Sequence, residues 1–146
     1  MSEPTTKESN PKDAIGCKKP PLSVLPAPAM YVAALALLDG ACKYRRHNWR
    51  IAGVRASIYY DAVMRHLTRC WEGEDTDPES GIPHLGHAMA CLIILLDSRL
   101  AGKLTDDRPP ALDPSWMKDI QSAVTQLLSR HPNPKTPFTI NDKPAS

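Results

Sequence analysis

The sequence has few aromatic residues, no closely spaced cysteines and no long hydrophobic run. Phe, Trp and Tyr together make up 5% of its 146 residues. The four cysteines lie more than 20 residues apart, which excludes Cys-x-x-Cys zinc or redox sites and favours free thiols in a reducing cytosol. The longest apolar run, residues 26–38, is shorter than the about 20 residues that a membrane helix needs. With no signal-peptide pattern at the start, we expect a cytoplasmic protein that makes no membrane contact.

Proline is scarce in the centre of the chain, although the whole sequence contains 15 prolines. Only Pro78 and Pro83 occur between Ala29 and Leu104. Because proline disrupts helix interiors, this distribution predicts a helical centre with irregular flanks. We therefore divide the chain into an extended N-terminal arm, a helical core and a C-terminal helix with a loose tail, over residues 1–28, 29–110 and 111–146.

Helical periodicity predicts an all-α fold, and no convincing period-two strand pattern occurs. The expected helices cover residues 29–46, 56–71, 83–100 and 113–130, with Ser57 and Asp113 as caps. Leu22, Val24 and Leu25 are expected to fix the arm on this core. The first and third helices are so apolar that one subunit is not expected to cover them, which predicts a homo-oligomer.

The formal net charge is only +2, but opposite charges gather in two segments. The basic segment runs from Lys43 to Arg50 and includes Tyr44 and Trp49, whereas the loop after the second expected helix holds five carboxylates within eight residues, 72–79. Arginine and lysine bind phosphate oxygens, and hard cations such as Mg²⁺ prefer carboxylates. The alternative is structural: the basic residues coat a helix end, the aromatics fill the core and the acids are merely solvated.

Three histidines lie close to this acidic loop. His84 and His87 are three residues apart, so they share one face of the third expected helix, and His66 lies on the preceding helix. Such a cluster is a candidate metal or acid–base site. If the metal is Mg²⁺ the loop acids should hold it, since imidazole suits Mn²⁺, Co²⁺ or Zn²⁺ better. Alternatively, the histidine pair is a polar helix start at an oligomer surface.

Seven short motifs occur in one order between residues 10 and 110. They are Asn10-Pro11-Lys12-Asp13-Ala14-Ile15-Gly16, Gly40-Ala41-Cys42-Lys43-Tyr44, His47-Asn48-Trp49-Arg50, Arg65-His66-Leu67, Gly73-Glu74-Asp75-x-Asp77-x-Glu79-Ser80-Gly81, His84-Leu85-x-His87-Ala88 and Asp106-Asp107-Arg108-Pro109. Together they resemble the phage and prophage family of dATP/dGTP diphosphohydrolases (MazZ-like proteins), which is related to the all-α MazG nucleotide pyrophosphohydrolases.

The resemblance implies a MazG-like helical bundle that hydrolyses dATP or dGTP to the monophosphate and pyrophosphate with Mg²⁺. MazG-type enzymes hold their metals with Glu-x-x-Glu and Glu-x-x-Asp motifs on successive helices. This chain has His84-Leu85-Gly86-His87 in place of such a motif on the third helix, and no carboxylate pair on the second. It also has Arg45 where the family is expected to have glycine more often.

These observations give one hypothesis for the site. We expect Glu74, Asp75, Glu79, His84 and His87 to hold Mg²⁺, or Mn²⁺ or Co²⁺, and His66, Glu74 and His87 to act in catalysis. The phosphates are assigned to Lys43, Arg50 and Arg65, and the base and sugar to Tyr44, Asn48 and Trp49. The metal would acidify a water that attacks the α-phosphorus of dATP or dGTP.

Two other functions compete with this hypothesis. The basic 43–50 segment is also typical of a small helical nucleic-acid-binding module. The acidic loop would repel a phosphate backbone, however, and the net charge is nearly neutral, so we do not expect nucleic acid as a partner. A third interpretation is a non-catalytic oligomer whose helices only associate.

Overall fold

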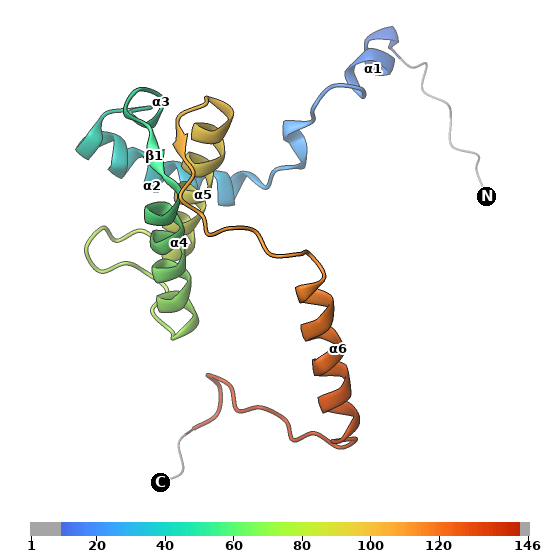
Figure 1. The fold of residues 1–146 in the computed structure, drawn as a ribbon. Helices are drawn as coiled ribbons and strands as arrows, with labels where there is room; N and C mark the ends of the chain where they lie inside the picture. The colour runs from blue at the N-terminus through green and yellow to red at the C-terminus, as the bar shows by residue number, and fades with distance from the viewer. Residues whose placement is uncertain (1–9, 144–146) are drawn as a thin grey trace, which may run out of the picture.

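The computed structural model describes residues 10–143, and α-helices dominate it (Figure 1). The predicted all-α class is confirmed, since the strands that it shows are two segments of two residues each. In chain order the elements are α1 (Pro11–Gly16), the 3₁₀ helix η1 (Leu22–Val24), α2 (Ala27–Tyr44), α3 (Trp49–Ala52), β1 (Val54–Arg55), α4 (Ala56–Trp71), α5 (His84–Leu100), β2 (Leu104–Thr105) and α6 (Trp116–Ser129).

Helix α5 is the centre of the core, where it packs against both α2 and α4. Small residues make the close approach possible: the buried residues of these helices include Ala33, Ala36, Ala88 and Ala90. Gly86 is the tightest point, because a Cβ there would lie 2.7 Å from Cγ1 of Val32 on α2. The core is therefore built on short side chains rather than on large interlocking ones.

A short parallel strand pair closes the C-terminal end of α5. Strands β1 and β2 pair with Val54 opposite Leu104, next to a hydrogen bond of 3.1 Å from Val54 N to Lys103 O. Gly53 precedes β1 with φ 75°, and a Cβ there would lie 2.7 Å from the Lys103 carbonyl oxygen. This junction requires glycine both for its left-handed φ and for its space.

The start of α4 is held by an acid from far along the chain. Asp107 accepts hydrogen bonds from Ser57 N at 2.8 Å and from Ser57 Oγ at 2.5 Å. The prediction that Ser57 caps this helix is therefore wrong, because Arg55 occupies the N-cap position and Ser57 donates. The prediction that Asp113 caps the last helix is also wrong, because α6 begins at Trp116, three residues later than expected, with Ser115 at the N-cap position. The Asp113 carboxylate accepts instead from Ser115 N, at 2.8 Å, just before the helix.

The predicted helix over residues 56–71 matches α4, and the other three differ at their ends. Helix α2 begins two residues earlier than expected and ends at Tyr44, because Arg45 has φ 73° and ψ 144°, which no helix can continue. Helix α5 begins one residue after Pro83. The sequence did not predict the four-residue helix α3.

The N-terminal arm is not simply extended, since it contains α1 and η1. Asn10 caps α1 by accepting from Lys12 N at 3.0 Å. Leu22 and Val24 are 74% and 72% exposed, so the prediction that they fix the arm on the core is wrong for this subunit alone. The part of the arm before Asn10 lies outside the described residues.

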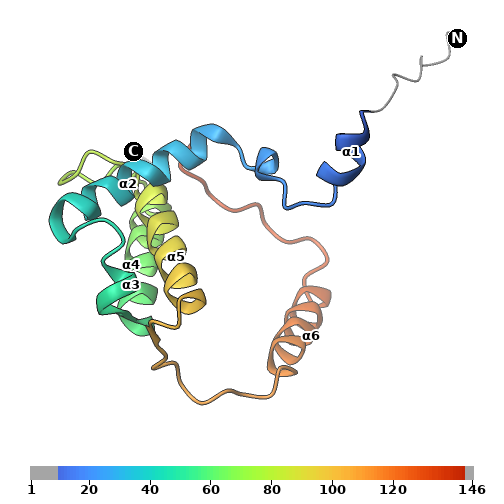
Figure 2. The same ribbon diagram turned by 90° about the horizontal axis from the view of Figure 1, so that it is seen from above.

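Helix α6 stands apart from the core at the end of a ten-residue connection, 106–115 (Figure 2). None of its residues is buried. No helix in the described part of the chain is long and apolar enough to cross a membrane. The four cysteines are free thiols, as their spacing predicted; Cys70 and Cys91 are half-buried, and Cys17 and Cys42 are exposed.

Candidate catalytic site

The acidic loop folds back so that its carboxylates and the start of α5 meet the end of α4. Glu74 N donates to Arg69 O at 3.0 Å, and His84 N donates to Asp75 O at 2.9 Å. An isolated bridge pairs Thr76 with Pro83, which starts α5 at a fixed place. These backbone contacts bring the predicted histidines and several of the predicted acids to one end of the core.

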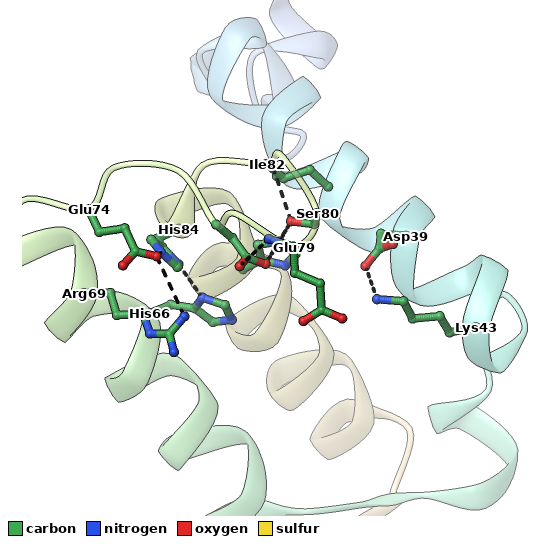
Figure 3. A network of polar contacts seen from close by, with 11 residues as sticks. Asp39, Lys43, His66, Arg69, Glu74, Glu79, Ser80, Ile82 and His84 are labelled. Atoms are coloured by element: carbon green, nitrogen blue, oxygen red, sulfur yellow. Dashed lines mark hydrogen bonds and ion pairs between the residues drawn. The ribbon is translucent and has the colours of Figure 1, made fainter.

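The three histidines form a cluster, as the sequence predicted, in which the ring of His66 contacts those of His84 and His87. Figure 3 shows His66 beside His84. The rings of His66 and His87 stack with centroids 4.8 Å apart and planes 10° from parallel. Nδ1 of His66 lies 2.9 Å from Nδ1 of His84, and Nε2 of His84 lies 3.1 Å from Oε1 of Glu74. His84 is fully buried, whereas His66 is half-buried.

Glu74 sets the protonation of this chain of rings. A carboxylate accepts only, so Nε2 of His84 carries the hydrogen that it donates to Glu74. In a neutral His84 ring, Nδ1 is then an acceptor, and Nδ1 of His66 must donate to it. Assigned from this network, neutral His66 keeps its free electron pair on Nε2. Glu74 thus acts through His84 to make His66 Nε2 a proton acceptor.

The surroundings also keep His66 uncharged. Burial, followed by the neighbouring imidazoles of His87 and His84, lowers the pKa of His66 below its ordinary value. A histidine with a lowered pKa is neutral at physiological pH, which is the state that accepts a proton.

Ser80 links His87 to an acid. Its hydroxyl donates to Oδ2 of Asp77 at 2.9 Å and lies 2.7 Å from Nε2 of His87. Since the single hydroxyl hydrogen goes to Asp77, Nε2 of His87 donates to Ser80. Burial alone would raise the pKa of Asp77, but the Ser80 hydroxyl, the Glu79 N–H and the imidazoles of His87 and His84 hold it below its usual range. Ser80 and Asp77 were not among the predicted site residues.

The predicted metal ligands do not form a coordination sphere in this arrangement. Among residues 10–143, no three His, Cys, Asp or Glu side chains are placed to hold one metal ion. The ring nitrogens of His84 already bind Glu74 and His66, and Nε2 of His87 binds Ser80. Asp75 and Glu79 are exposed, and Glu74 also lies 3.8 Å from Arg69. The donor set as folded does not fit a bound cation, and the metal assignment stays a prediction.

The basic segment divides into separate ion pairs. Lys43 binds Asp39 on the same helix at 2.8 Å, and this hydrogen bond raises the pKa of Lys43. Trp49 Nε1 donates to Oδ2 of Asp97 at 2.6 Å, and Arg50 makes two bonds of 2.7 Å to the same carboxylate. Arg50, and then Trp49, hold the pKa of Asp97 well below its usual range. These pairings neutralise much of the charge on which a nucleic-acid surface would depend.

Among the predicted substrate residues, Trp49 and Arg50 meet at the Asp97 carboxylate, whereas the other four belong to α2, to α4 and to the turn before α3. Trp49 is buried in the way that the structural alternative described, whereas Tyr44 is 66% exposed. Asn48 is half-buried in the turn before α3, and Arg65 is exposed on α4. Their assignment to phosphates, base and sugar stays a prediction. Sequence reasoning missed Asp97, since its spacing from His87 on the same helix gives no reason to select it.

Comparison with known proteins places this fold in a family. The family described as "dATP/dGTP diphosphohydrolase, N-terminal" matches residues 9–108, which is more than half of the chain. The chain belongs to the dATP/dGTP diphosphohydrolase family. The matched segment contains every residue of the histidine cluster and its acidic loop, and it ends before α6 begins.

One relative extends this family likeness beyond the matched segment. A protein of Salmonella phage PMBT28 named "dATP/dGTP diphosphohydrolase" is 29% identical over 126 residues, which are 86% of this chain and 41% of that protein. The chain thus spans about two fifths of the length of this relative. No solved structure matches the chain, so the expected likeness to MazG bundles stays a prediction.

Proposed function

We propose that this diphosphohydrolase-family chain hydrolyses dATP or dGTP to the deoxynucleoside monophosphate and pyrophosphate. The observation that supports the proposal is the chain of contacts from Glu74 through His84 to His66, which leaves His66 Nε2 as a proton acceptor. The family to which the chain belongs supplies the substrate class.

In the proposed reaction His66 acts as the general base. Its Nε2 takes a proton from a water, whose oxygen forms a bond to the α-phosphorus while the bond to the bridging oxygen breaks and pyrophosphate leaves. Such transfer depends mainly on positioning and on stabilising charge. His87, stacked on His66, would fix the ring, and Lys43 and Arg65 would contact the phosphates. Arg69, 3.8 Å from Glu74, adds a cation that the sequence did not single out.

The cofactor is tested separately, because the donor set as folded does not fit a metal. Mg²⁺, Mn²⁺ and Co²⁺ are assayed in turn with each of four deoxynucleoside and four ribonucleoside triphosphates. Pyrophosphate and orthophosphate are measured in the same samples. Pyrophosphate from dATP or dGTP supports the proposal, whereas orthophosphate or inorganic triphosphate as the product would contradict it.

Substitutions test the site. We expect His66→Gln to lower kcat by about a hundredfold or more, the usual contribution of a general base, while helicity measured by circular dichroism stays unchanged. Glu74→Ala and His87→Ala should abolish turnover in the same way. His131→Gln is the matched control, since His131 is exposed beyond α6. Near-normal pyrophosphate release by the three variants of the cluster would remove this site from the reaction.

A second candidate is nucleotide binding without hydrolysis by this chain alone. It is favoured by the match to the part of the family described as N-terminal, and by the span of about two fifths of the phage relative. Here dGTP would raise the melting temperature of the chain, as any ligand of the folded state does, with no pyrophosphate formed. The same nucleotide panel therefore separates the two candidates.

We also propose that the chain forms a homo-oligomer. Its accessible surface is 13121 Å², whereas a compact monomer of 16.1 kDa is expected to expose about 7,400 Å². Much of the excess is apolar, and α6 alone presents Trp116, Met117, Ile120, Val124, Leu127 and Leu128, each 45–56% exposed. Sedimentation velocity should show an oligomer that Ile120→Lys weakens and that Ser122→Lys, on the opposite, polar face of α6, does not. A monomer at all concentrations would contradict the proposal.

A further inference from the structure

A pocket lies at the other end of α5 from the histidine cluster, between α2, α3 and α5. Its volume is about 430 Å³, within the range typical of small-molecule sites. Leu37, Leu38 and Ala41 on α2 and Ile93 on α5 form apolar walls. Asp97, Trp49 and Arg50 contribute a polar side that is already tied together by hydrogen bonds. The pocket therefore offers flat apolar contact next to fixed polar groups.

Arg46 is the group in this pocket that has no partner of its own. Within the described chain its guanidinium makes no ion pair or side-chain hydrogen bond, whereas the neighbouring Arg50 donates two hydrogen bonds to Asp97. A guanidinium presents several N–H donors in one plane. Next to apolar walls, these donors suit the edge of a planar heterocycle.

The backbone on both sides of Arg46 is strained. Arg45 has φ 73° and His47 has φ 60°, although neither is a glycine. Such conformations are unfavourable for residues with a Cβ and persist where the surrounding structure requires them, often at ligand sites. Here the two strained residues set the direction of Arg46 and of His47, which also lines the pocket. The strained backbone is thus in the same short segment as Arg46, whose guanidinium has no partner in the described chain.

We propose that this pocket binds the purine base of the nucleotide, with Arg46 donating to N7. N7 is an acceptor present on adenine and guanine and absent from pyrimidines, so one contact would select both purines. Asp97 follows His87 by ten residues on α5, which is about 15 Å along the helix axis. A base in the pocket would direct its sugar and phosphates along α5 towards the histidine cluster. The choice of a nucleotide as the ligand rests on the proposed function.

Binding of monophosphates tests the pocket without requiring turnover. Isothermal titration of the full chain with dGMP, dAMP and dCMP should show that both purines bind at least tenfold more tightly than dCMP. Arg46→Gln should weaken dGMP and dAMP by about tenfold, the usual effect of removing a hydrogen bond from a charged donor, and leave dCMP unchanged. Ala41→Phe should abolish binding of all three by filling the pocket.

Matched variants control for folding and for charge. Arg99→Gln is the control for Arg46→Gln, because it removes an exposed arginine that lies on α5, outside the pocket lining. Cys42→Phe is the control for Ala41→Phe, because it adds a phenyl ring at the exposed neighbouring position on α2. Both should bind dGMP as the unmodified chain does, and thermal melts should show all four variants folded. Equal affinity for dGMP and dCMP, or unchanged dGMP binding by folded Ala41→Phe, overturns the proposal.

The experiments can overturn the pocket proposal and the proposed hydrolysis separately. If Ala41→Phe and Arg46→Gln release pyrophosphate from dGTP with unchanged KM, the pocket is not the base site although the proposed function stands. If the unmodified chain binds dGMP through these residues but releases no pyrophosphate, the pocket stands and the hydrolysis does not. Absence of any binding by the unmodified chain overturns the pocket proposal.

Discussion

The two ends of α5 carry polar networks of different kinds. At the N-terminal end, His66 contacts both His84 and His87, and each ring nitrogen is a donor or an acceptor according to its protonation. At the C-terminal end, Asp97 accepts three hydrogen bonds from Trp49 and Arg50, whose N–H groups can only donate. One network is able to exchange protons and partners, whereas the other fixes α3 on α5.

This difference indicates how the fold divides its tasks. The two ends differ in which residues take unusual backbone angles. Arg45 and His47, the two non-glycine residues with positive φ among residues 10–143, belong to the end where the network is fixed, whereas the positive φ values of the loop before α5 fall on Gly73 and Gly81. The histidine end depends instead on helix packing through Gly86 and on a loop closed by backbone hydrogen bonds. We therefore expect substitutions at the C-terminal end to change stability first, and those at the histidine end to change chemistry first.

The largest loss of stability is expected for Gly53→Ala. The new Cβ would lie 2.7 Å from the Lys103 carbonyl oxygen, in a residue with φ 75°, so the strand pair must shift. Strain and overpacking together should cost about 3 kcal/mol, measured by urea unfolding. Gly40→Ala is the control, because nothing lies within 4 Å of a Cβ there and alanine should stabilise α2 by about 1 kcal/mol. Equal midpoints for the two variants would show that the C-terminal end is not rigid.

Gly86→Ala tests the same kind of change at the histidine end. Its Cβ would lie 2.7 Å from Val32 Cγ1 and 3.2 Å from Val32 O, which pushes α2 from α5. Overpacking costs about 1–3 kcal/mol, but alanine returns about 1 kcal/mol of helix propensity, so we expect a net loss of about 1–2 kcal/mol. The unfolding midpoint should fall less than in Gly53→Ala. A larger loss here would reverse the comparison between the two ends.

Local pattern was enough to predict the four long helices and the histidine cluster. Helix α4 matches its predicted range because periodicity and the break at Gly53 both act locally. His84 and His87 follow from helical spacing, and the short loop after α4 makes contact with His66 unavoidable. The sequence also indicated Arg45 as a place where glycine would be usual, and its φ of 73° agrees.

Contacts between distant residues were not predictable. Asp97 lies 47 residues after Arg50, and Asp107 lies 50 residues after Ser57, so no periodicity relates either pair. Trp49 was assigned to substrate because it lies in a basic segment, although its indole N–H is used by Asp97. The role of a charged residue depends on the acid that the fold brings to it, and that acid is known only once the helices are packed.

Arg45→Gly is expected to raise the free energy of unfolding, by less than the two glycine substitutions lower it. Glycine adopts φ 73° and ψ 144° without a side-chain clash, so the substitution should stabilise the chain by about 1 kcal/mol. The gain is reduced by the larger backbone entropy that glycine loses on folding. Arg46→Gly is the control, since Arg46 has no positive φ and should lose stability. If Arg45→Gly instead lowers the melting temperature, the turn is not strained and the case for a specialised pocket weakens.

The smallest expected effect is that of Asp97→Asn on how the stability of the chain changes with pH in acid. Arg50 and Trp49 hold the pKa of Asp97 below its ordinary value, so near pH 4 the unfolded chain binds a proton that the folded chain does not. The stability that Asp97 contributes is therefore present above its unfolded pKa and is lost as pH falls towards its folded pKa.

The asparagine side chain of the variant does not titrate, and its amide oxygen can still accept from Trp49. Melting temperatures measured between about pH 5 and pH 2 should thus fall less steeply in the variant, although Asp77 and Asp107, whose pKa values are also lowered, preserve part of the slope. Asp119→Asn, on the exposed helix α6, is measured alongside as the matched substitution. The same slope in Asp97→Asn and in the unmodified chain would mean that the Arg50–Asp97 pair does not act on the folded state, and the two ends of α5 would no longer differ in the way described.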